Sequence, residues 1–356
     1  MMTFLTPTGN INLAEDDRVA KTPWYVGVLR RPELGALLGA VVIFVVFTAA
    51  DTTGQFATLS GAAGWTDFAA PVGIVAVFVA LLMISGEFDL SAGVMVGTSG
   101  LFAGLLISEL GWGVWPTIFA TLAMAAVVGF INGLLVVRTA LPSFIVTLGT
   151  FFVLKGANLA ITKGLTGTVR VSGVDQAEGF DSARVLFASE VPIAGASFQI
   201  TILWWIALTV LATILLTRTV FGNWIFASGG DANAARNAGV PVNRTKVILF
   251  VLTSMSAALV GVMFLLRLRG MQAGQGVGQE FYYIIAAAVG GCLLTGGAGS
   301  AIGASIGALI MGFAAVGIPY ALWDQDWVST FLGVILFSAV LINITISRRA
   351  QGGRRK

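Results

Sequence analysis

Long apolar runs separated by short polar stretches are the feature of this sequence that most limits its fold. A helix needs roughly 20 apolar residues to cross a bilayer. We expect ten such spans, with approximate limits 33–51, 69–86, 90–109, 113–137, 142–161, 198–217, 246–266, 279–296, 300–319 and 326–346. The second and third meet at "GEFDLS" and form either two spans or one broken element. The sequence therefore predicts an all-α polytopic membrane protein of about ten transmembrane helices, some of them broken or re-entrant.

The composition agrees with a membrane protein and argues against an enzyme. Of the 356 residues, 57% are hydrophobic and 10% are charged, whereas soluble domains carry about 25% charged residues. The chain has no histidine, which removes the usual general base, the Ser-His-Asp triad and histidine metal sites. Its single cysteine, Cys292, cannot form an internal disulfide.

The distribution of positive charge predicts the orientation. Ten spans place both termini on one side, and with that side cytoplasmic most of the 20 lysines and arginines fall on inside loops, as the positive-inside rule requires. We therefore expect a cytoplasmic N-terminal tail or interfacial segment at 1–32, a transmembrane domain at 33–346 and a basic cytoplasmic tail at 347–356. Lys155 lies within a span. The outside set is Lys163, Arg170, Arg184, Arg267 and Arg269.

Two polar loops interrupt the apolar runs. The inside loop at 218–246 contains "GGDANAARNAGVPVNRTK", in which Asp231 can cap a short helix and Gly239 can end it. An ordinary connector would also carry charges at helix ends, but the internal helix and its small residues favour a docking surface. The outside loop at 162–197 is polar and mixed in charge, and its size suits a lid or a docking surface for an external partner.

Polar residues next to or inside the spans are candidates for contact with a transported solute. In "GEFDLS", the two acids either cap a helix break or touch the solute, and the sequence leaves both readings open. The stretch "RGMQAGQGVGQEFYY" combines amides, a carboxylate and rings, which suit a sugar; an interfacial aromatic belt is the plainer reading. The candidate path residues are Glu87, Asp89, Asn132, Gln272, Gln275, Glu280 and Tyr282.

The glycine-rich segments predict helix packing rather than nucleotide binding. Gly299, Gly303 and Gly307 repeat every four residues and predict close helix packing. Their segment lacks the spacing of a dinucleotide motif, and the chain contains no G-x-x-x-x-G-K-[ST] sequence. We therefore expect no ATP-phosphate cradle of the P-loop kind in this chain.

Four stretches in order carry a family resemblance. "ASGGDANAARNAGVPVNRTKVILFVLTSMSAALVG" resembles the cytoplasmic coupling segment of the membrane subunits of bacterial ABC importers for ribose, xylose and arabinose. "GEFDLSAGVMVG" (86–97), "NGLLVVRTALPSFIVTLGT" (132–150) and "GGCLLTGGAGSAIGASIGALIMG" (290–312) resemble further elements of that family. The chain departs from the family pattern at Glu87 and Tyr282, which affects the identity of the solute more than the family.

The resemblance implies a permease subunit of an ATP-driven importer that moves a pentose or hexose across a bacterial inner membrane by alternating access. It implies no cofactor in this chain, because ATP and magnesium would bind a partner ABC ATPase. It also implies a periplasmic sugar-binding protein, a second permease chain (identical or homologous) and the lipid bilayer as partners, and no nucleic acid. The residues that would contact the ATPase are Asp231, Ala235, Arg236, Asn237, Gly239, Asn243 and Arg244.

Other solutes and one other transport class stay open. Relatives of this family move nucleosides, branched-chain amino acids or a quorum signal derived from a pentose-like dione. A secondary transporter driven by an ion gradient would need ionisable groups near the midplane, and Glu87, Asp89, Lys155 and Glu280 are the candidates. Dependence on ATP or on the gradient separates the two classes.

Overall fold

The computed structural model describes residues 32–352 except residue 140, and it is mostly helical. The expectations for residues 1–31 and 353–356 lie outside the described residues. The helices are α2 (Pro32–Ala50), α3 (Leu59–Ile84), α4 (Ala92–Ser108), α5 (Val114–Thr139), α6 (Ser143–Thr166), α7 (Phe180–Phe187), α8 (Thr201–Arg218), α9 (Val220–Gly230), α10 (Ala232–Asn237), α11 (Val242–Leu268), α12 (Gln279–Val289), α13 (Ala301–Tyr320) and α14 (Trp327–Gly352), with a 3-10 turn at Val174–Gln176. The four strands are β1 (Arg170–Ser172), β2 (Glu190–Ile193), β3 (Ala196–Gln199) and β4 (Gly270–Gln272).

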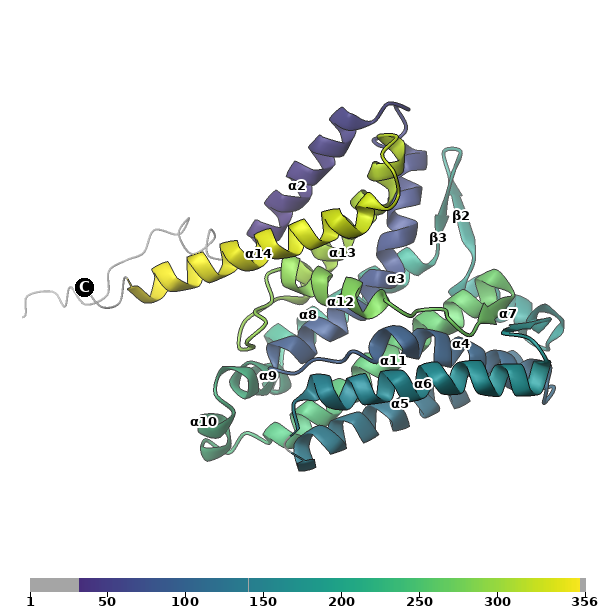
Figure 1. Ribbon diagram of the computed structural model, residues 1–356, viewed down its shortest axis with the longest axis horizontal. Coiled ribbons are helices and arrows are strands. Elements are labelled where there is room, and N and C mark those ends of the chain that lie inside the picture. The colour runs from purple at the N-terminus through teal and green to yellow at the C-terminus, as the bar shows by residue number, and fades with distance from the viewer. Residues whose placement is uncertain (1–31, 140, 353–356) are drawn as a thin grey trace, which may run out of the picture.

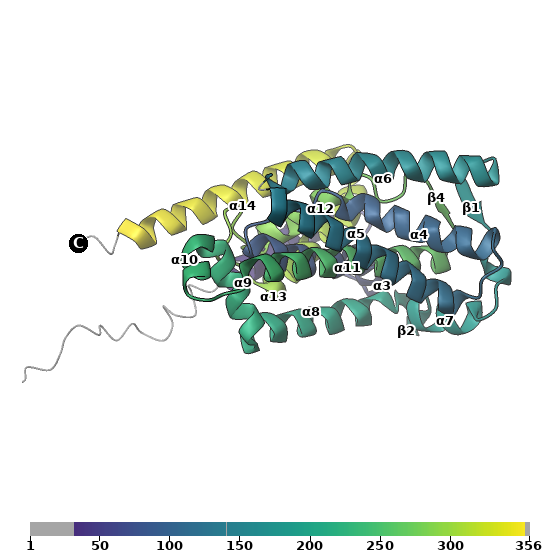
Figure 2. The same ribbon diagram turned by 90° about the horizontal axis from the view of Figure 1, so that it is seen from below.

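Helix α3 forms the centre of the molecule. Its C-terminal half, from Val72 to Ile84, is buried almost without interruption. An apolar helix can face either lipid or protein in a membrane protein; α3 faces protein, because it packs against α8, α11, α12 and α13. On one side of it, α4, α5, α6 and α11 form a bundle of nearly parallel helices (Figures 1 and 2). Helices α2 and α13 run at a wide angle to that bundle (Figure 1).

Seven of the described helices are long and apolar enough to cross a membrane: α2, α3, α5, α6, α8, α11 and α13. Two shorter apolar helices, α4 and the first part of α14, correspond to the expected spans 90–109 and 326–346. The total of ten crossings and the side on which the termini lie stay predictions. Helix α14 continues to Gly352, so it includes part of the segment expected as a tail from residue 347.

The expected span 279–296 is wrong as a single helix. Helix α12 ends at Val289, and an irregular loop follows it up to Ser300. Gly291, Gly296 and Gly297 in this loop have positive φ angles of 93°, 84° and 78°. Apolar composition predicted a span here, but these left-handed glycines end the helix. The break is consistent with the expectation that some elements are broken or re-entrant.

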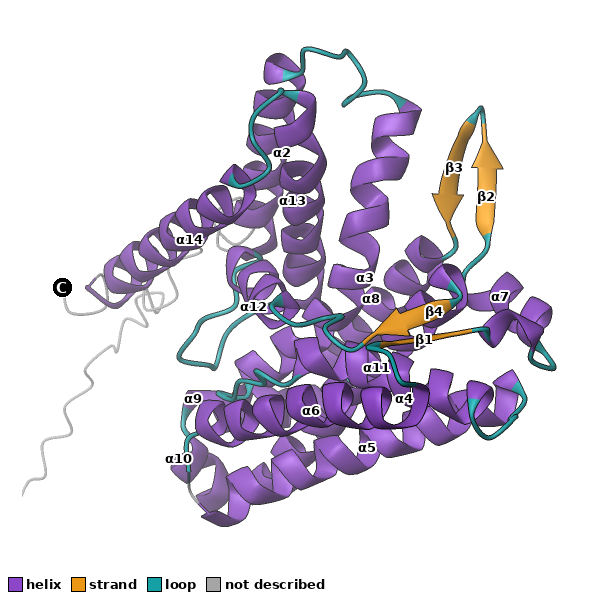
Figure 3. Cartoon of the chain, turned by 45° about the vertical axis from the view of Figure 1, so that its right-hand side comes forward, coloured by secondary structure: helices purple, strands orange, loops and turns teal. Residues whose placement is uncertain are grey.

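Two small antiparallel pairs of strands depart from an entirely α-helical fold. Strands β2 and β3 form a hairpin that projects away from the bundle helices, beside α3 (Figure 3). Strand β1 follows α6 and pairs with β4, which follows α11. The loop expected at 162–197 is therefore structured, because α6 continues to Thr166 and α7 and the strands occupy most of the rest. The β1–β4 pair brings the segment after α11 alongside the end of α6.

Candidate functional site

The stretch "GEFDLS" forms a break between α3 and α4. The chain turns at Gly86, whose φ is +87°, and α4 begins at Ala92. Asp89 is buried, with 1% of its surface exposed. Its Oδ1 accepts hydrogen bonds from the backbone N–H of Ser91 (2.8 Å) and from the Ser91 hydroxyl (2.5 Å). Asp89 Oδ2 has no hydrogen-bond partner among the described residues.

Hydroxyl groups of α6 bond the backbone of this break. Ser143 Oγ accepts a hydrogen bond from the N–H of Phe88 (3.0 Å), and Thr147 Oγ1 accepts one from the N–H of Leu90 (3.0 Å). Backbone groups outside a helix need such partners where water is excluded. The "PSFIVTLGT" motif thus satisfies the backbone of the "GEFDLS" motif, although the two are more than 50 residues apart in the sequence.

Asn132 joins the break to α5 and α6. Its amide donates from Nδ2 to Ser91 Oγ (3.0 Å), and its Oδ1 accepts from the hydroxyl of Thr150 (2.6 Å). Asn132 is fully buried. Asp89, Ser91, Asn132 and Thr150 are joined by side-chain hydrogen bonds. Together with Ser143 and Thr147, which bond the backbone of the same break, we call them the break network (Asp89, Ser91, Asn132, Ser143, Thr147 and Thr150). Within it, the bond from Thr150 to Asn132 joins α6 to α5.

An ion pair connects the break to α11. Lys246, in the first turns of α11, bonds Glu87 Oε1, and their side chains are only 14% and 12% exposed. The two residues are 159 positions apart in the sequence. The carboxylate of Glu87 is therefore paired with a side chain of the same chain, and this pair joins the first turns of α11 to the break.

The polar connector between α9 and α11 contains the expected short helix, α10. Asp231 Oδ1 accepts hydrogen bonds from the N–H groups of Asn233 (2.9 Å) and Ala234 (3.0 Å), and Gly239 follows the helix with a φ of +84°. Arg236 donates to Asn233 (3.0 Å) and to Asn243 (3.4 Å). In this segment Ala235 is buried, while Asp231, Arg236, Asn237, Gly239, Asn243 and Arg244 are exposed. The connector therefore offers a polar surface, and α10 contacts α9 and α11.

Close glycine contacts link α10 to the break. Gly229, at the end of α9, lies directly against the carbonyl of Ile84 at the end of α3, and a Cβ at position 229 would overlap it. Gly297 donates from its N–H to the same Ile84 carbonyl (2.8 Å). A Cβ at Gly296 would lie 2.9 Å from the Cα of Gly86. Three segments thus meet here, at what we call the glycine junction (Gly86, Gly229, Gly296 and Gly297).

The segment after α11 lies along α4, where the other predicted path residues are found. Side chains at Gly93, Gly97 or Gly100 of α4 would collide with Glu280, Gln275 and Met271, respectively. Glu280 is 4% exposed, and its carboxylate accepts from the N–H of Gly278 at 3.0 and 3.2 Å.

The predicted path residues fall into two groups. One group lies at the break between α3 and α4 and contains Glu87, Asp89 and Asn132. The other group lies along α4 and α12 and contains Gln272, Gln275, Glu280 and Tyr282. Within the second group, Gln272 is exposed and Gln275 is partly exposed. Tyr282 is also partly exposed, and its ring lies 6.0 Å from that of Phe68.

The three glycines expected to form one packing face have two different roles. Gly303 and Gly307 lie on α13 so close to the carbonyls of Gly290 and Ala286 that a Cβ would overlap either one. Gly299 precedes the helix, which is capped by Ser300, and its φ of +155° belongs to the loop. The helical repeat therefore contains only two of the three positions.

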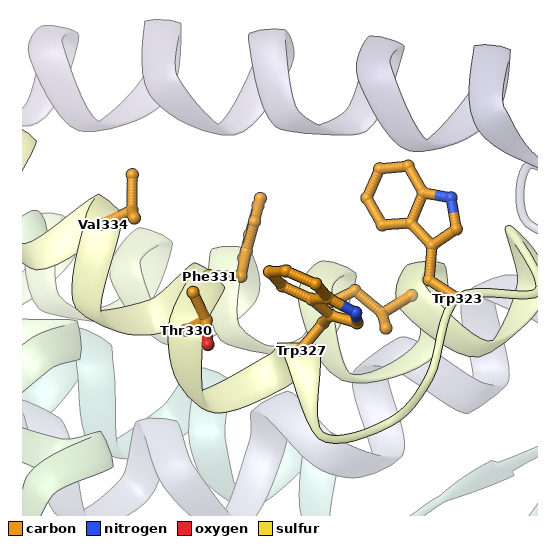
Figure 4. Close-up of a pocket in the computed structure, with 6 residues that line it drawn as sticks. Trp323, Trp327, Thr330, Phe331 and Val334 are labelled. Carbon is orange, nitrogen blue, oxygen red and sulfur yellow. The ribbon is translucent and has the colours of Figure 1, made fainter.

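A cavity of about 440 Å³ lies apart from these residues, where α13 ends and α14 begins. It is lined by Ile318, Trp323, Trp327, Thr330, Phe331 and Val334 (Figure 4). Its lining is almost entirely apolar, with one hydroxyl, so it does not suit a hydroxyl-rich solute. Tryptophans at a helix end are typical of a membrane interface.

Sequence reasoning missed the partners of the break. Ser143, Thr147 and Thr150 are spaced by four and three residues and therefore lie on one face of a helix. That polar stripe in an apolar span was the available signal. The missed partner of Glu87, Lys246, carried no local signal, because only the fold brings α11 to the break.

Comparison with known proteins agrees with this architecture. Residues 61–340 match the family model described as "Branched-chain amino acid transport system / permease component". The chain is 30% identical to the fructose import permease protein FrcC of Rhizobium meliloti (78% of this chain and 76% of that one), and 30% identical to the xylose transport system permease protein XylH of Escherichia coli K12 (88% and 92%). It is 27% identical to the autoinducer 2 import system permease protein LsrD of Salmonella paratyphi B (76% and 79%). No solved structure gives a significant match. The chain therefore belongs to this family of multi-pass membrane permeases, whose curated relatives include sugar permeases of ABC transporters.

Proposed function

We propose that this chain is the membrane-spanning subunit of an ATP-driven importer that moves a monosaccharide, a pentose or hexose, across the bacterial inner membrane by alternating access. The relatives named for fructose and xylose transport support a sugar. The relative named for autoinducer 2 and the family description for branched-chain amino acids define the alternative solutes. The chain lacks a P-loop sequence, so ATP would be hydrolysed by a partner subunit.

The connection between α10 and the broken helix is the observation that carries this proposal. Helix α10 is mostly exposed and begins three residues after Gly229, which lies against the end of α3. On its other side the chain enters α11, where Lys246 bonds Glu87. A displacement of α10 by a partner ATPase would therefore reach the break along two routes, one through backbone contact and one through an ion pair.

In this mechanism the ATPase selects between two arrangements of the permease. ATP binding closes the ATPase, and it favours whichever permease arrangement has an α10 position that binds the closed ATPase more tightly than the other arrangement does. A second permease chain, identical or homologous, completes the path, and a periplasmic sugar-binding protein delivers the solute. The hairpin and α7, at the end of the molecule opposite α10, are the surface for that delivery (Figure 1).

The test replaces the contact surface of α10. Arg236→Glu combined with Gly239→Pro should leave the protein in the membrane but remove the co-purifying ATPase and lower ATP-dependent sugar uptake at least tenfold. Arg138→Glu, an exposed charge reversal at the end of α5, is the matched control and should retain both. Uptake by the double variant at the normal rate would overturn the role of α10.

The driving force is tested separately in membrane vesicles. ATP is supplied on the face of the vesicle membrane that carries the ATPase. It should drive uptake of the solute even after ionophores have collapsed the ion gradients. Uptake that follows the gradient and ignores ATP would instead show a secondary transporter. A panel of pentoses, hexoses, a branched-chain amino acid and a nucleoside then identifies the solute class.

A further inference from the structure

Lys155 has a position that the break network and α10 do not explain. It lies in the middle of α6, twelve residues after Ser143 and eleven before Thr166, and its side chain is exposed. At a rise of about 1.5 Å per residue, either end of the helix is roughly 17 Å away. A four-carbon side chain is too short to reach a membrane interface about 15 Å from the bilayer centre.

The surroundings of Lys155 do not neutralise it by direct pairing. Its ammonium lies 5.8 Å from the centre of the Phe151 ring. No ion pair within 4 Å joins it to an acid in the described part of the chain. The carboxylate of Glu280 interacts with it electrostatically at longer range. Charged side chains at this depth face a water-filled cavity or a partner rather than lipid.

Two more polar side chains continue the same edge of α6. Asn158 and Thr162 follow Lys155 by three and seven residues, so all three lie on one face of the helix. Asn158 is 6% exposed and Thr162 is fully buried. Neither Asn158 Nδ2 nor Thr162 Oγ1 has a hydrogen-bond partner among the described residues. Buried polar groups are almost always hydrogen-bonded, to protein, water or ligand.

The segment between β4 and α12 supplies acceptors and donors near this edge. Strand β4 pairs with β1, which directly follows α6, and α6 and the Gln275–Glu280 stretch both pack on α4. Figure 2 shows α6, β4, α4 and α12 on the same side of the molecule. Gln275 is partly exposed there, and the carboxylate of Glu280 is buried and bonded to the N–H of Gly278.

We propose that the edge of α6 formed by Lys155, Asn158 and Thr162, together with Gln275 and Glu280, is a hydrogen-bonding wall of the solute path. This inference rests on the proposed function. One positive and one negative charge balance in this wall, so it favours an uncharged, hydroxyl-rich solute over an anion or a cation. Lys155 donates to hydroxyl oxygens, and the carboxylate of Glu280 accepts from hydroxyl groups.

Cysteine labelling tests whether this edge of α6 is accessible from water. Lys155→Cys, Asn158→Cys and Thr162→Cys are made separately in the full chain, assembled with its ATPase in membranes, and treated with a small charged methanethiosulfonate reagent. The native Cys292 is buried, and unsubstituted protein measures its background. Val153→Cys is the matched control, because Val153 is 69% exposed, lies two residues from Lys155 and therefore points to a different face of α6.

We expect Lys155→Cys, at an exposed position, to be labelled at least tenfold faster than Val153→Cys, and Asn158→Cys and Thr162→Cys, at buried positions, to reach such rates during ATP turnover. Excess transported sugar should slow the labelling. Labelling no faster than at Val153→Cys at all three positions would overturn the wall. Fast labelling that the sugar leaves unchanged would show a water cavity outside the solute path and would also overturn it. Using three positions keeps the result meaningful if one variant fails to insert.

Transport measurements separate this inference from the proposed function. Lys155→Met should lower the maximal rate of sugar uptake at least tenfold without changing ATPase co-purification, and Lys155→Arg should retain most of the rate because it keeps a cationic donor. Normal uptake by Lys155→Met would refute the role of Lys155 while leaving the importer intact. If unsubstituted protein showed no ATP-dependent uptake of any solute, the proposed function itself would fail.

Discussion

The two breaks in this bundle hold their non-helical backbone in different ways. In the break at 85–91 the first N–H groups still bond carbonyls at the end of α3, but those of Phe88 and Leu90 bond side chains of another helix, Ser143 and Thr147. The break at 290–300 bonds mainly to its own backbone: the N–H of Leu293 donates to the carbonyl of Ala298 (3.0 Å), and that of Gly296 donates to Leu293 (3.0 Å). Backbone N–H and C=O groups inside a membrane protein must be hydrogen-bonded in one way or the other.

This difference determines which residues each break can tolerate. A break bonded by side chains needs hydroxyls and amides at fixed positions on its neighbours, but its own residues can be large, such as Phe88. A break bonded by its own backbone must fold tightly and lie close to its neighbours, which favours glycine. The two breaks meet where Gly297 donates to Ile84, so a change in either can reach the other.

Filling the space at the second break should have the largest effect. Gly303→Leu would drive a side chain into the carbonyl of Gly290, and overpacking of this kind costs about 3 kcal/mol or more when backbone must move. We expect little monodisperse protein in detergent, measured by gel filtration of a fluorescent fusion. Gly149→Leu is the control, because a Cβ at that α6 glycine has no atom within 4 Å. Equal yields from the two variants would show that the second break does not depend on close packing against its neighbours.

Removing a side-chain bond from the first break should have the next largest effect. Asn132→Leu deletes the bonds to Ser91 and Thr150 and leaves the buried Asp89–Ser91 pair without its outer partner. Polar contacts between membrane helices contribute about 0.6 to 2 kcal/mol each, so we expect a loss of roughly 2 kcal/mol and a lower unfolding temperature in detergent. Thr139→Ala, which removes an exposed hydroxyl from the same helix, should leave the temperature nearly unchanged.

Ser300 sharpens the comparison, because it places one side-chain bond within the second break. Its hydroxyl accepts from the N–H of Gly303 (3.2 Å) and caps α13. Ser300→Ala should cost about 1 kcal/mol, the usual value of such a cap. A drop in unfolding temperature as large as that of Asn132→Leu would mean that the second break also depends chiefly on side-chain bonds.

Local signals predicted much of this fold, and tertiary contacts decided the rest. The long spans follow from hydropathy, and α10 with its cap at Asp231 and its end at Gly239 follows from short-range chemistry. The irregular loop after α12 could not be predicted from hydropathy, because "GGCLLTGGAGS" is apolar and glycine-rich, as a packed span also is. What distinguishes it is the positive φ of its glycines, which depends on the neighbouring backbone.

The candidate site shows the same division. The sequence singled out Glu87, Asp89 and Asn132 as polar residues in an apolar setting, and the structure places all three at the first break. The sequence left open whether Glu87 and Asp89 cap a helix or touch a solute. Ser91 is the local partner of Asp89, whereas Glu87 bonds Lys246 across 159 residues. A pairing over that separation depends on how α11 packs, which no local pattern encodes.

The Glu87–Lys246 pair should have the most specific effect on function. Both side chains are largely buried, so Lys246→Met, which leaves the Glu87 carboxylate without its partner, should also lower the unfolding temperature. Because the pair ties the first turns of α11 to the first break, we expect fewer sugar molecules moved per ATP hydrolysed. The exchange Glu87→Lys with Lys246→Glu restores opposite charges and should recover most of that ratio.

A double-mutant cycle decides whether this link acts as a pair. If each single variant lowers the ratio of transport to hydrolysis and the exchange recovers it, the coupling runs through the contact between the two side chains. If the exchange is no better than the single variants, each residue acts by itself. The first break would then sense α10 through the glycine junction alone, and the backbone route, which relies on the same close packing as the second break, would carry the whole signal.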